Sequence, residues 1–278
     1  MSFWLLTNVA GDEATTLDNK GASITATGYT LTDVISGPRS TRWRSGAIAA
    51  TLAISYHFDP TGGGDVEATH VVIARADWLV TLGTARVRIQ QRSSGGTWSN
   101  LITLDPFTSS SLVGIVKTGK THGQDYVAAI TPTQKRGYGI DFLSWSSNEA
   151  FQVSKVYFCN GVNLGDPLPG IQWSVIDEYI RPQRSTIPYR CERRLAIQWT
   201  DLRDTQVALL THARTDGDGG IPGRLRQPLN WPMFLYDDAG NIWDWKLEHV
   251  LLESYQLTQI GKDCWTLAMT FVRLMHYD

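Results

Sequence analysis

The sequence has few cysteines, no long apolar run and no excess of basic residues. Its three cysteines, Cys159, Cys191 and Cys264, lie far apart without a C-x-x-C pair, so we predict free buried thiols rather than a disulfide framework or thiolate metal site. No segment approaches the roughly 18 apolar residues of a membrane helix. The net charge of -2 provides no basic field for a phosphate backbone, so nucleic acid is not an expected partner.

The N-terminal residues carry only a short apolar run, residues 3–6, and no basic residue precedes it. A secretory signal needs both a basic start and a longer apolar region. The sequence therefore predicts a soluble protein that is made in the cytosol and does not insert into a membrane.

Short apolar runs separated by Gly, Pro, Ser and Asn fill residues 24–158, where helix signals are almost absent. Residues 86–90 alternate polar and apolar side chains, which predicts a half-buried strand with Val87 and Ile89 facing a core. Further strands are predicted at residues 50–58, 71–74, 126–130, 138–143 and 153–158. These strands are enough for two packed sheets.

The composition of the sequence changes at residues 160–170, which are rich in Gly, Pro and Asn. This stretch is predicted to link two domains, 1–165 and 166–278. A helix is predicted over residues 201–213, capped by Thr200 or Asp201. Its partial apolar face consists of Leu202, Val207, Leu209 and Leu210. Strands are predicted at residues 233–236, 242–247, 250–257 and 265–274, with turns at 237–241 and 261–263. The second domain is thus expected to be a small antiparallel β-barrel or sheet with one helix.

One stretch matches an enzymatic motif. Residues 114–121, Gly-Ile-Val-Lys-Thr-Gly-Lys-Thr, fit the phosphate-binding pattern G-x-x-x-x-G-K-[ST], with Lys120 as its lysine. Such a loop works between a buried strand and a helix N-terminus. Here a serine-rich stretch precedes it and a β-like run follows, so we favour a hairpin between strands. A nucleotide-hydrolysing protein remains the third hypothesis for function.

No other catalytic or metal-binding pattern is recognisable. The segment Asp216-Gly217-Asp218-Gly219-Gly220 hints at a calcium loop, but Gly220 takes the third ligand position and Gln227 replaces the terminal glutamate. The six histidines show no H-x-H or H-E-x-x-H spacing, and no G-x-S-x-G nucleophile elbow occurs. We therefore predict no catalytic residues, no metal, no cofactor and no enzymatic activity.

Eleven tryptophans offer candidates for stacking on a sugar. Trp43 and Trp145 lie in apolar runs and are predicted to be core residues. Trp98 lies at a predicted turn and Trp78 follows Asp77 at a strand end. The candidate glycan-binding residues are therefore Asp77, Trp78, Trp98 and Asn100.

Residues 181–194 hold five arginines, a composition typical of a solvated or subunit-facing surface. Together with the glycine-rich loop they provide the candidate oligomer contacts. These are Arg181, Arg184, Arg190, Arg193, Arg194, Asp216 and Asp218.

Residues 28–45, which lead through an irregular loop to Trp43, resemble the opening of discoidin-like, galactose-binding-like jelly rolls. The predicted strand pair at 71–78 and 85–89 and a closing strand near 156–159 fit the same pattern. The resemblance implies a jelly-roll sandwich over residues 1–165. Because such domains bind glycans in some families and only build contacts in others, it leaves function open.

The second part resembles the β-barrel-with-helix domains of long-tailed bacteriophage tail-tip and baseplate proteins of the distal-tail kind, through residues 190–197 and 265–274. This resemblance implies a structural virion protein of the phage tail, assembled in the host cytoplasm. It would form a homo-oligomeric ring, contact other tail or baseplate proteins and add a weak host-glycan contact. The alternative is a free-standing carbohydrate-binding module.

Overall fold

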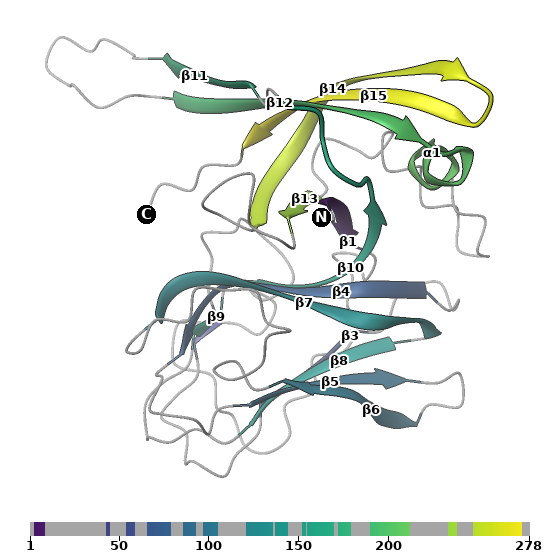
Figure 1. The fold of residues 1–278 in the computed structure, drawn as a ribbon. Helices are drawn as coiled ribbons and strands as arrows, with labels where there is room; N and C mark the ends of the chain where they lie inside the picture. Colours follow the sequence, from purple (N-terminus) through teal and green to yellow (C-terminus); the bar gives the residue numbers. More distant parts are fainter. Residues whose placement is uncertain are drawn as a thin grey trace, which may run out of the picture. The chain divides into compact units, whose positions relative to one another are not determined.

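The computed structural model describes residues 3–8, 43–44, 54–58, 66–78, 86–92, 97–104, 121–135, 137–143, 152–153, 155–169, 172–178, 190–211, 233–237 and 247–273. These residues form antiparallel strands and one helix, α1 (Asp204–Thr211), which confirms the predicted mainly β fold class (Figure 1). The strands are β1 (Phe3–Asn8), β2 (Trp43–Arg44), β3 (Ile54–Phe58), β4 (Val66–Trp78), β5 (Arg86–Arg92), β6 (Trp98–Leu104), β7 (Thr121–Lys135), β8 (Gly137–Leu143), β9 (Gln152–Val153), β10 (Lys155–Asn163), β11 (Gln172–Glu178), β12 (Arg190–Leu202), β13 (Met233–Asp237), β14 (Leu247–Gly261) and β15 (Cys264–Arg273). No helix in this described part is long and apolar enough to cross a bilayer.

The chain divides into two compact units. The sandwich unit comprises Asn8–Asn160 with Asp216–Gly219, and the terminal unit comprises Met1–Thr7, Gly161–Thr215 and Gly220–Asp278. The predicted division placed all of residues 1–165 in the first domain. The structure instead pairs β1 with β13 from the far end of the chain, so the sandwich unit is inserted between two parts of the terminal unit.

In the sandwich unit, β4 pairs with β7 on one side and with β9 and β10 on the other. A second sheet has the order β3-β8-β5-β6 and forms a separate layer (Figure 1). The strands predicted at 50–58, 71–74, 86–90, 126–130, 138–143 and 153–158 overlap these elements, with shifted ends.

Tyr138 joins the two layers. Its ring, on β8, stacks on that of Phe158, on β10, with 5.2 Å between the centroids. Its hydroxyl accepts a hydrogen bond from the backbone N–H of Ala68, on β4, at 3.0 Å. A buried tyrosine whose hydroxyl is satisfied contributes apolar area without leaving an unpaired polar group. This side chain therefore fixes the spacing of the sandwich.

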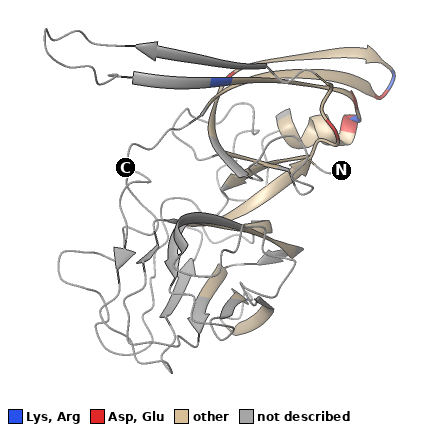
Figure 2. Cartoon of the chain, turned by 60° about the vertical axis from the view of Figure 1, so that its left-hand side comes forward, with Lys and Arg blue, Asp and Glu red and all other residues tan. Residues whose placement is uncertain are grey.

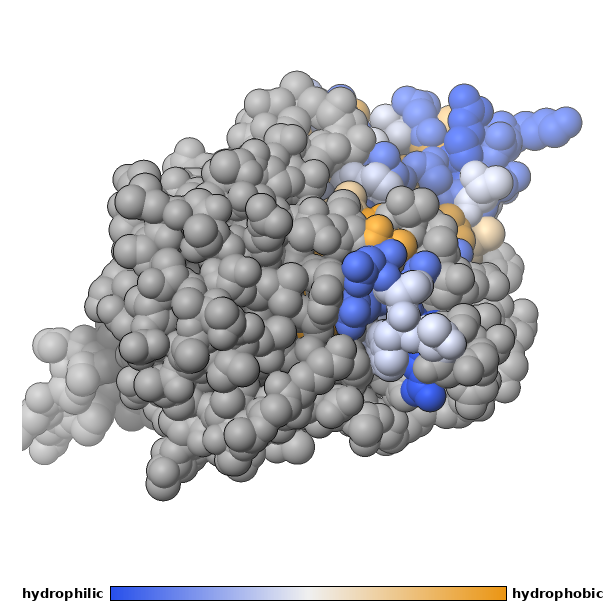
Figure 3. All heavy atoms as spheres, turned by 90° about the horizontal axis from the view of Figure 1, so that it is seen from below, coloured by the Kyte–Doolittle hydropathy of each residue, from blue (hydrophilic) through white to orange (hydrophobic). Residues whose placement is uncertain are grey.

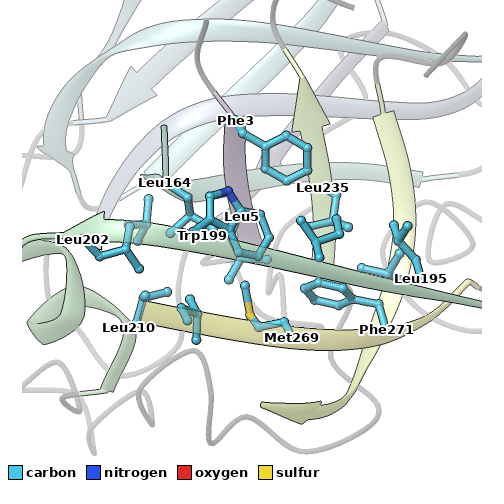
Figure 4. Close-up of a cluster of buried hydrophobic side chains, with 14 of the residues drawn as sticks. Phe3, Leu5, Leu164, Leu195, Trp199, Leu202, Leu210, Leu235, Met269 and Phe271 are labelled. Carbon is cyan, nitrogen blue, oxygen red and sulfur yellow. The ribbon is translucent and has the colours of Figure 1, made fainter. Parts of the chain in front are cut away.

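The terminal unit has the strand order β11-β12-β15-β14-β13-β1. Alternate residues of these strands point into one apolar core, in which the ring of Phe3 lies 5.4 Å from that of Trp199 (Figure 4). Leu5 pairs with Leu235, and the Leu164 N–H donates to the Phe3 carbonyl at 2.7 Å. The core comprises Phe3, Leu5, Val162, Leu164, Leu195, Ile197, Trp199, Leu202, Val207, Leu210, Leu235, Val250, Leu267, Met269 and Phe271.

The first part of the predicted link, residues 160–163, belongs to a strand, because β10 continues to Asn163. The chain then bends at Gly165, whose φ of 71° is a conformation that glycine adopts without strain. The side-chain oxygen of Asn163 accepts the Gly165 N–H at 2.9 Å and closes the turn.

Helix α1 begins three residues after the predicted start, because β12 extends to Leu202 and buries that side chain in the core. The predicted caps, Thr200 and Asp201, are therefore strand residues. The first helical hydrogen bond runs from the Val207 N–H to the Arg203 carbonyl, and the Gln206 side chain accepts the Arg203 N–H at 2.8 Å. Val207 and Leu210 are buried, whereas Leu209 is exposed.

The turn between β14 and β15 holds the start of the helix. The Asp263 carboxylate accepts the Asp204 N–H at 2.6 Å, and the Asp204 carboxylate accepts the Trp265 indole N–H at 2.6 Å. Arg203 lies 3.7 Å from the Asp263 carboxylate. Figure 2 shows charged residues gathered at this turn and at α1. Because the first N–H groups of a helix have no partner within it, Asp263 acts as a cap supplied by another element.

Replacing Asp263 tests this cap. Asp263 has a φ of 53°, which glycine adopts without strain, so Asp263→Gly removes the acceptor with little backbone cost. We expect a loss of about 1 kcal/mol of folding free energy, and thermal unfolding of the terminal unit about 2–4 °C lower. Asp263→Asn, which keeps a side-chain oxygen, and Lys262→Ala, at the neighbouring exposed position, should stay close to wild type. An equal loss in Asp263→Asn would show that the cap is not the cause.

Candidate functional site

Strands β5 and β6 of the smaller sheet of the sandwich unit place polar and aromatic side chains in two adjacent cross-strand rows. Arg92 on β5 pairs with Trp98 on β6, and Gln90 pairs with Asn100. On the other side of β5, Arg92 pairs with Gly137 of β8, and Gln90 pairs with Gly139. Arg92 and Gln90 are two residues apart on one strand, so their side chains share a face of the sheet.

A bulge aligns the second row. Ile89 pairs with Ile102, but the next pair is Gln90 with Asn100, so Leu101 is an extra residue on β6. In a regular strand Asn100 would point to the same side as Ile102. The bulge turns it to the side of Gln90, whose amide N–H donates to the Asn100 side-chain oxygen at 3.3 Å.

The first row is held by a cation–π contact. The guanidinium carbon of Arg92 lies 5.9 Å from the centre of the Trp98 ring. Both side chains are half-buried, Asn100 is exposed, and Gln90 is buried with 6% of its surface exposed. The described surface on the side of β5 and β6 is mostly hydrophilic, with small apolar areas (Figure 3). We call the set Gln90, Arg92, Trp98 and Asn100 the Trp98 face.

The Trp98 face contains the kinds of group that hold a sugar. An indole ring offers an apolar surface to C–H groups, and amide and guanidinium groups bond to hydroxyl oxygens. Rigid side chains with few polar anchors are typical of small-ligand sites. The face therefore has the chemistry to bind a polar ring with one apolar side.

The structure brings together only two of the four predicted glycan-binding residues. Trp98 and Asn100 share β6, whereas Asp77 and Trp78 end β4, a strand of the other sheet, with side chains outside the described residues. Trp98 opens a strand rather than lying in a turn. The sequence pattern did not single out Gln90, which lies within the predicted alternation of residues 86–90, or Arg92, which extends that alternation by one step.

The predicted oligomer contacts are only partly described. Arg194 on β12 forms an ion pair within the chain, 2.8 Å from Glu253 on β14. Arg190 and Arg193 lie on β12 with side chains outside the described residues, and Arg181, Arg184, Asp216 and Asp218 lie outside them entirely. Their role in oligomer contacts stays a prediction.

The described residues give little basis for nucleotide or metal chemistry. Thr121, the last residue of the phosphate-binding motif, opens strand β7, where a working motif needs a helix, and Lys120 lies outside the described residues. Within the described ranges, no group of three or more His, Cys, Asp or Glu side chains is placed to hold a metal ion.

Two described cysteines are free thiols in different surroundings. Cys159 is fully buried on β10, and burial raises the pKa of its thiol far above the ordinary value. Cys264 donates to the Asp201 carboxylate at 3.4 Å. Partial burial, this hydrogen bond and the charge of Asp201 raise the pKa of Cys264, while Arg203 opposes the rise.

No protein-family model and no curated protein matches the chain. Among solved structures it is similar to chitosan-binding module 1 of a chitosanase/glucanase from Paenibacillus sp. IK-5, at 12% identity and a TM-score of 0.37, covering 55% of this chain and 98% of that one. It is also similar to CpGH89CBM32-4 of Clostridium perfringens in complex with GlcNAc-α-1,4-galactose, at 12% identity and a TM-score of 0.34, covering 56% and 94%. A third is CBM32-1 from a family 31 glycoside hydrolase of Clostridium perfringens, at 10% identity and a TM-score of 0.33, covering 51% and 93%. These values are too low for a function to be carried over.

Thiol labelling tests the surroundings of Cys264. In a Cys191→Ser background at about pH 8, we expect Cys159 to stay unlabelled until the protein unfolds, because its thiolate is disfavoured and covered. Asp201→Asn should speed labelling of Cys264, since removing a like charge lowers its pKa. Arg203→Gln should slow the labelling of Cys264, because removing this positive charge raises the pKa of the thiol further. Equal rates in all three proteins would contradict this account.

Proposed function

We propose that the sandwich unit is a non-catalytic carbohydrate-binding module and that the Trp98 face is its sugar contact. The observation that carries this proposal is the register of β5 and β6, which places an indole, a guanidinium and an amide pair in two adjacent rows. Sugar recognition needs such a combination, because a pyranose ring has both an apolar face and a rim of hydroxyl groups.

The face is also preorganised. Gln90 is buried and bonded to Asn100, and Arg92 rests on Trp98, so these side chains lose little freedom when a ligand arrives. Preorganised side chains cost less entropy on binding, which matters for a ligand as flexible and well hydrated as an oligosaccharide.

Truncating Trp98 tests this proposal. Binding should first be located on a glycan array and then measured by calorimetry with the best oligosaccharide. Trp98→Ala should weaken the Kd by about tenfold or more, since the stacked ring and the packing of Arg92 are both lost. Leu209→Ala, which removes an exposed large side chain of the terminal unit, is the control and should bind as wild type. Absence of any glycan binding by the folded wild-type protein would overturn the proposal.

A second role, as an oligomeric component of a phage tail tip or baseplate, follows from the sequence resemblance of the C-terminal part. One observation favours a partner there: Tyr255 and Ile260 of β14 are 42% and 57% exposed, although both are large and apolar. Large apolar side chains that are exposed on an isolated chain are available for contact with a partner.

Light scattering of the purified protein tests the oligomer. We expect a closed homo-oligomer whose mass is a multiple of the 31.0 kDa chain, and partial dissociation by Ile260→Ser through loss of apolar contact. Gln256→Ser, at an exposed polar position of the same strand, is the control. A monomer at every concentration examined would contradict the ring-forming role and leave carbohydrate binding unaffected.

A further inference from the structure

The outer half of the β14–β15 hairpin presents an exposed strand edge (Figure 1). β13 pairs with β14 only from Leu247 to Val250, and beyond that point the strand paired with β14 within the described residues is β15. Every residue from Glu253 to Gly261 except Leu257 is exposed, whereas residues 267–271 of β15 alternate between buried and half-buried. Alternate residues of β14 therefore direct their backbone N–H and C=O groups away from β15 along an exposed edge.

This edge lacks the usual features that prevent pairing with another chain. Proteins blunt exposed edges with charged side chains, proline or bulges. Residues 254–261, Ser-Tyr-Gln-Leu-Thr-Gln-Ile-Gly, contain no charged residue and no proline. Irregular pairing occurs only on either side of residues 254–259, which form a regular ladder with β15. We call residues 254–259 the β14 edge. Its backbone is suited to accept a further strand by β-augmentation.

The side chains of the β14 edge form two rows. Tyr255 pairs with Met269 and Leu257 pairs with Leu267, so this row lies on the core side of the sheet. Tyr255 is nevertheless 42% exposed and is available to a partner. Alternate residues point to the opposite side. There the row consists of Ser254, Gln256 and Thr258. One row is thus largely apolar, and the other is polar and uncharged.

A second copy of the same strand matches both rows. A two-fold axis perpendicular to the sheet pairs the two strands antiparallel and keeps each row on its own side of the joined sheet. The polar row then meets the polar row of the other copy, and Tyr255 and Leu257 meet their counterparts. Because the β14 edge carries no charge, this pairing brings no like charges together within it.

We infer that two copies of the chain associate through their β14 edges and join the sheets of their terminal units into one. This inference rests on the proposed homo-oligomer and adds the contact surface. A two-fold contact is closed, because each copy offers the same edge to the other, so its simplest product is a dimer. Backbone hydrogen bonds supply much of the contact, which is why Gln256→Ser leaves it intact.

Opposite charges introduced at Gln256 test the pairing. In the two-fold arrangement, Gln256 of one copy lies beside the polar row of the other. Gln256→Lys and Gln256→Glu should therefore each weaken the dimer Kd by about tenfold or more, through repulsion between identical charges. An equimolar mixture of the two variants should dimerise again, because Lys then faces Glu. Sedimentation velocity over a range of concentrations measures all three samples.

Gln198 provides the matched control. It is exposed and lies in the same cross-strand row, since Gln198 and Gln256 both pair with Ala268. Gln198→Lys places the same charge on the same side of the sheet, two strands or about 10 Å farther from the β14 edge. This variant should dimerise as wild type. Hydrogen exchange of the backbone amides of residues 254–259 should slow as wild-type concentration rises, but not in Gln256→Lys.

The possible failures are distinguishable. A wild-type monomer at every concentration would overturn both the inference and the proposed homo-oligomer. An oligomer that persists in Gln256→Lys and in Gln256→Glu would overturn the β14 contact and leave the homo-oligomer standing. If both variants dissociate but their mixture does not reassociate, the two-fold pairing is wrong, because Gln256 then faces a different strand of the partner.

Discussion

Pairing of the first strand with a strand near the end of the chain is the constraint on which the rest of the architecture depends. Thr7 pairs with Met233, and Phe3 and Leu5 lie in the core of the terminal unit. The chain leaves that unit after β1 and returns to it at Gly161, so the sandwich unit is an insertion. The entropic cost of closing a loop rises only slowly with the length of the loop. A large folded unit can therefore be inserted between the two paired strands.

The alternating pattern of residues 86–90 predicted β5 correctly, because alternation of side chains is a local property of a strand. The same reasoning gave no prediction for β1. Residues 3–6 are all apolar, without alternation, and the partner strand that buries them lies at the opposite end of the sequence. Helix α1 is an intermediate case, because its existence was predictable but its first residue was not. The helix starts only where β12 ends, and β12 continues to Leu202 because that side chain is buried in the core.

The candidate site was predictable only in part. Trp98 and Asn100 were chosen for their residue types and for the turn signals before them, and both lie on β6. Gln90 and Arg92 become their neighbours through the pairing of β5 with β6 and through the bulge at Leu101, which sequence periodicity does not reveal. The part that Asp77 and Trp78 play in glycan binding stays a prediction. Their strand, β4, belongs to the other layer of the sandwich.

Charged side chains have different kinds of partner in the two units. In the terminal unit, Arg194 is paired with Glu253, and Asp263 is bonded to the start of α1, so these charges hold elements of the unit together. On the Trp98 face, Arg92 rests on an aromatic ring, which stabilises a cation without cancelling its charge. Arginine therefore joins two strands of one sheet in the terminal unit and packs on an aromatic ring in the sandwich unit.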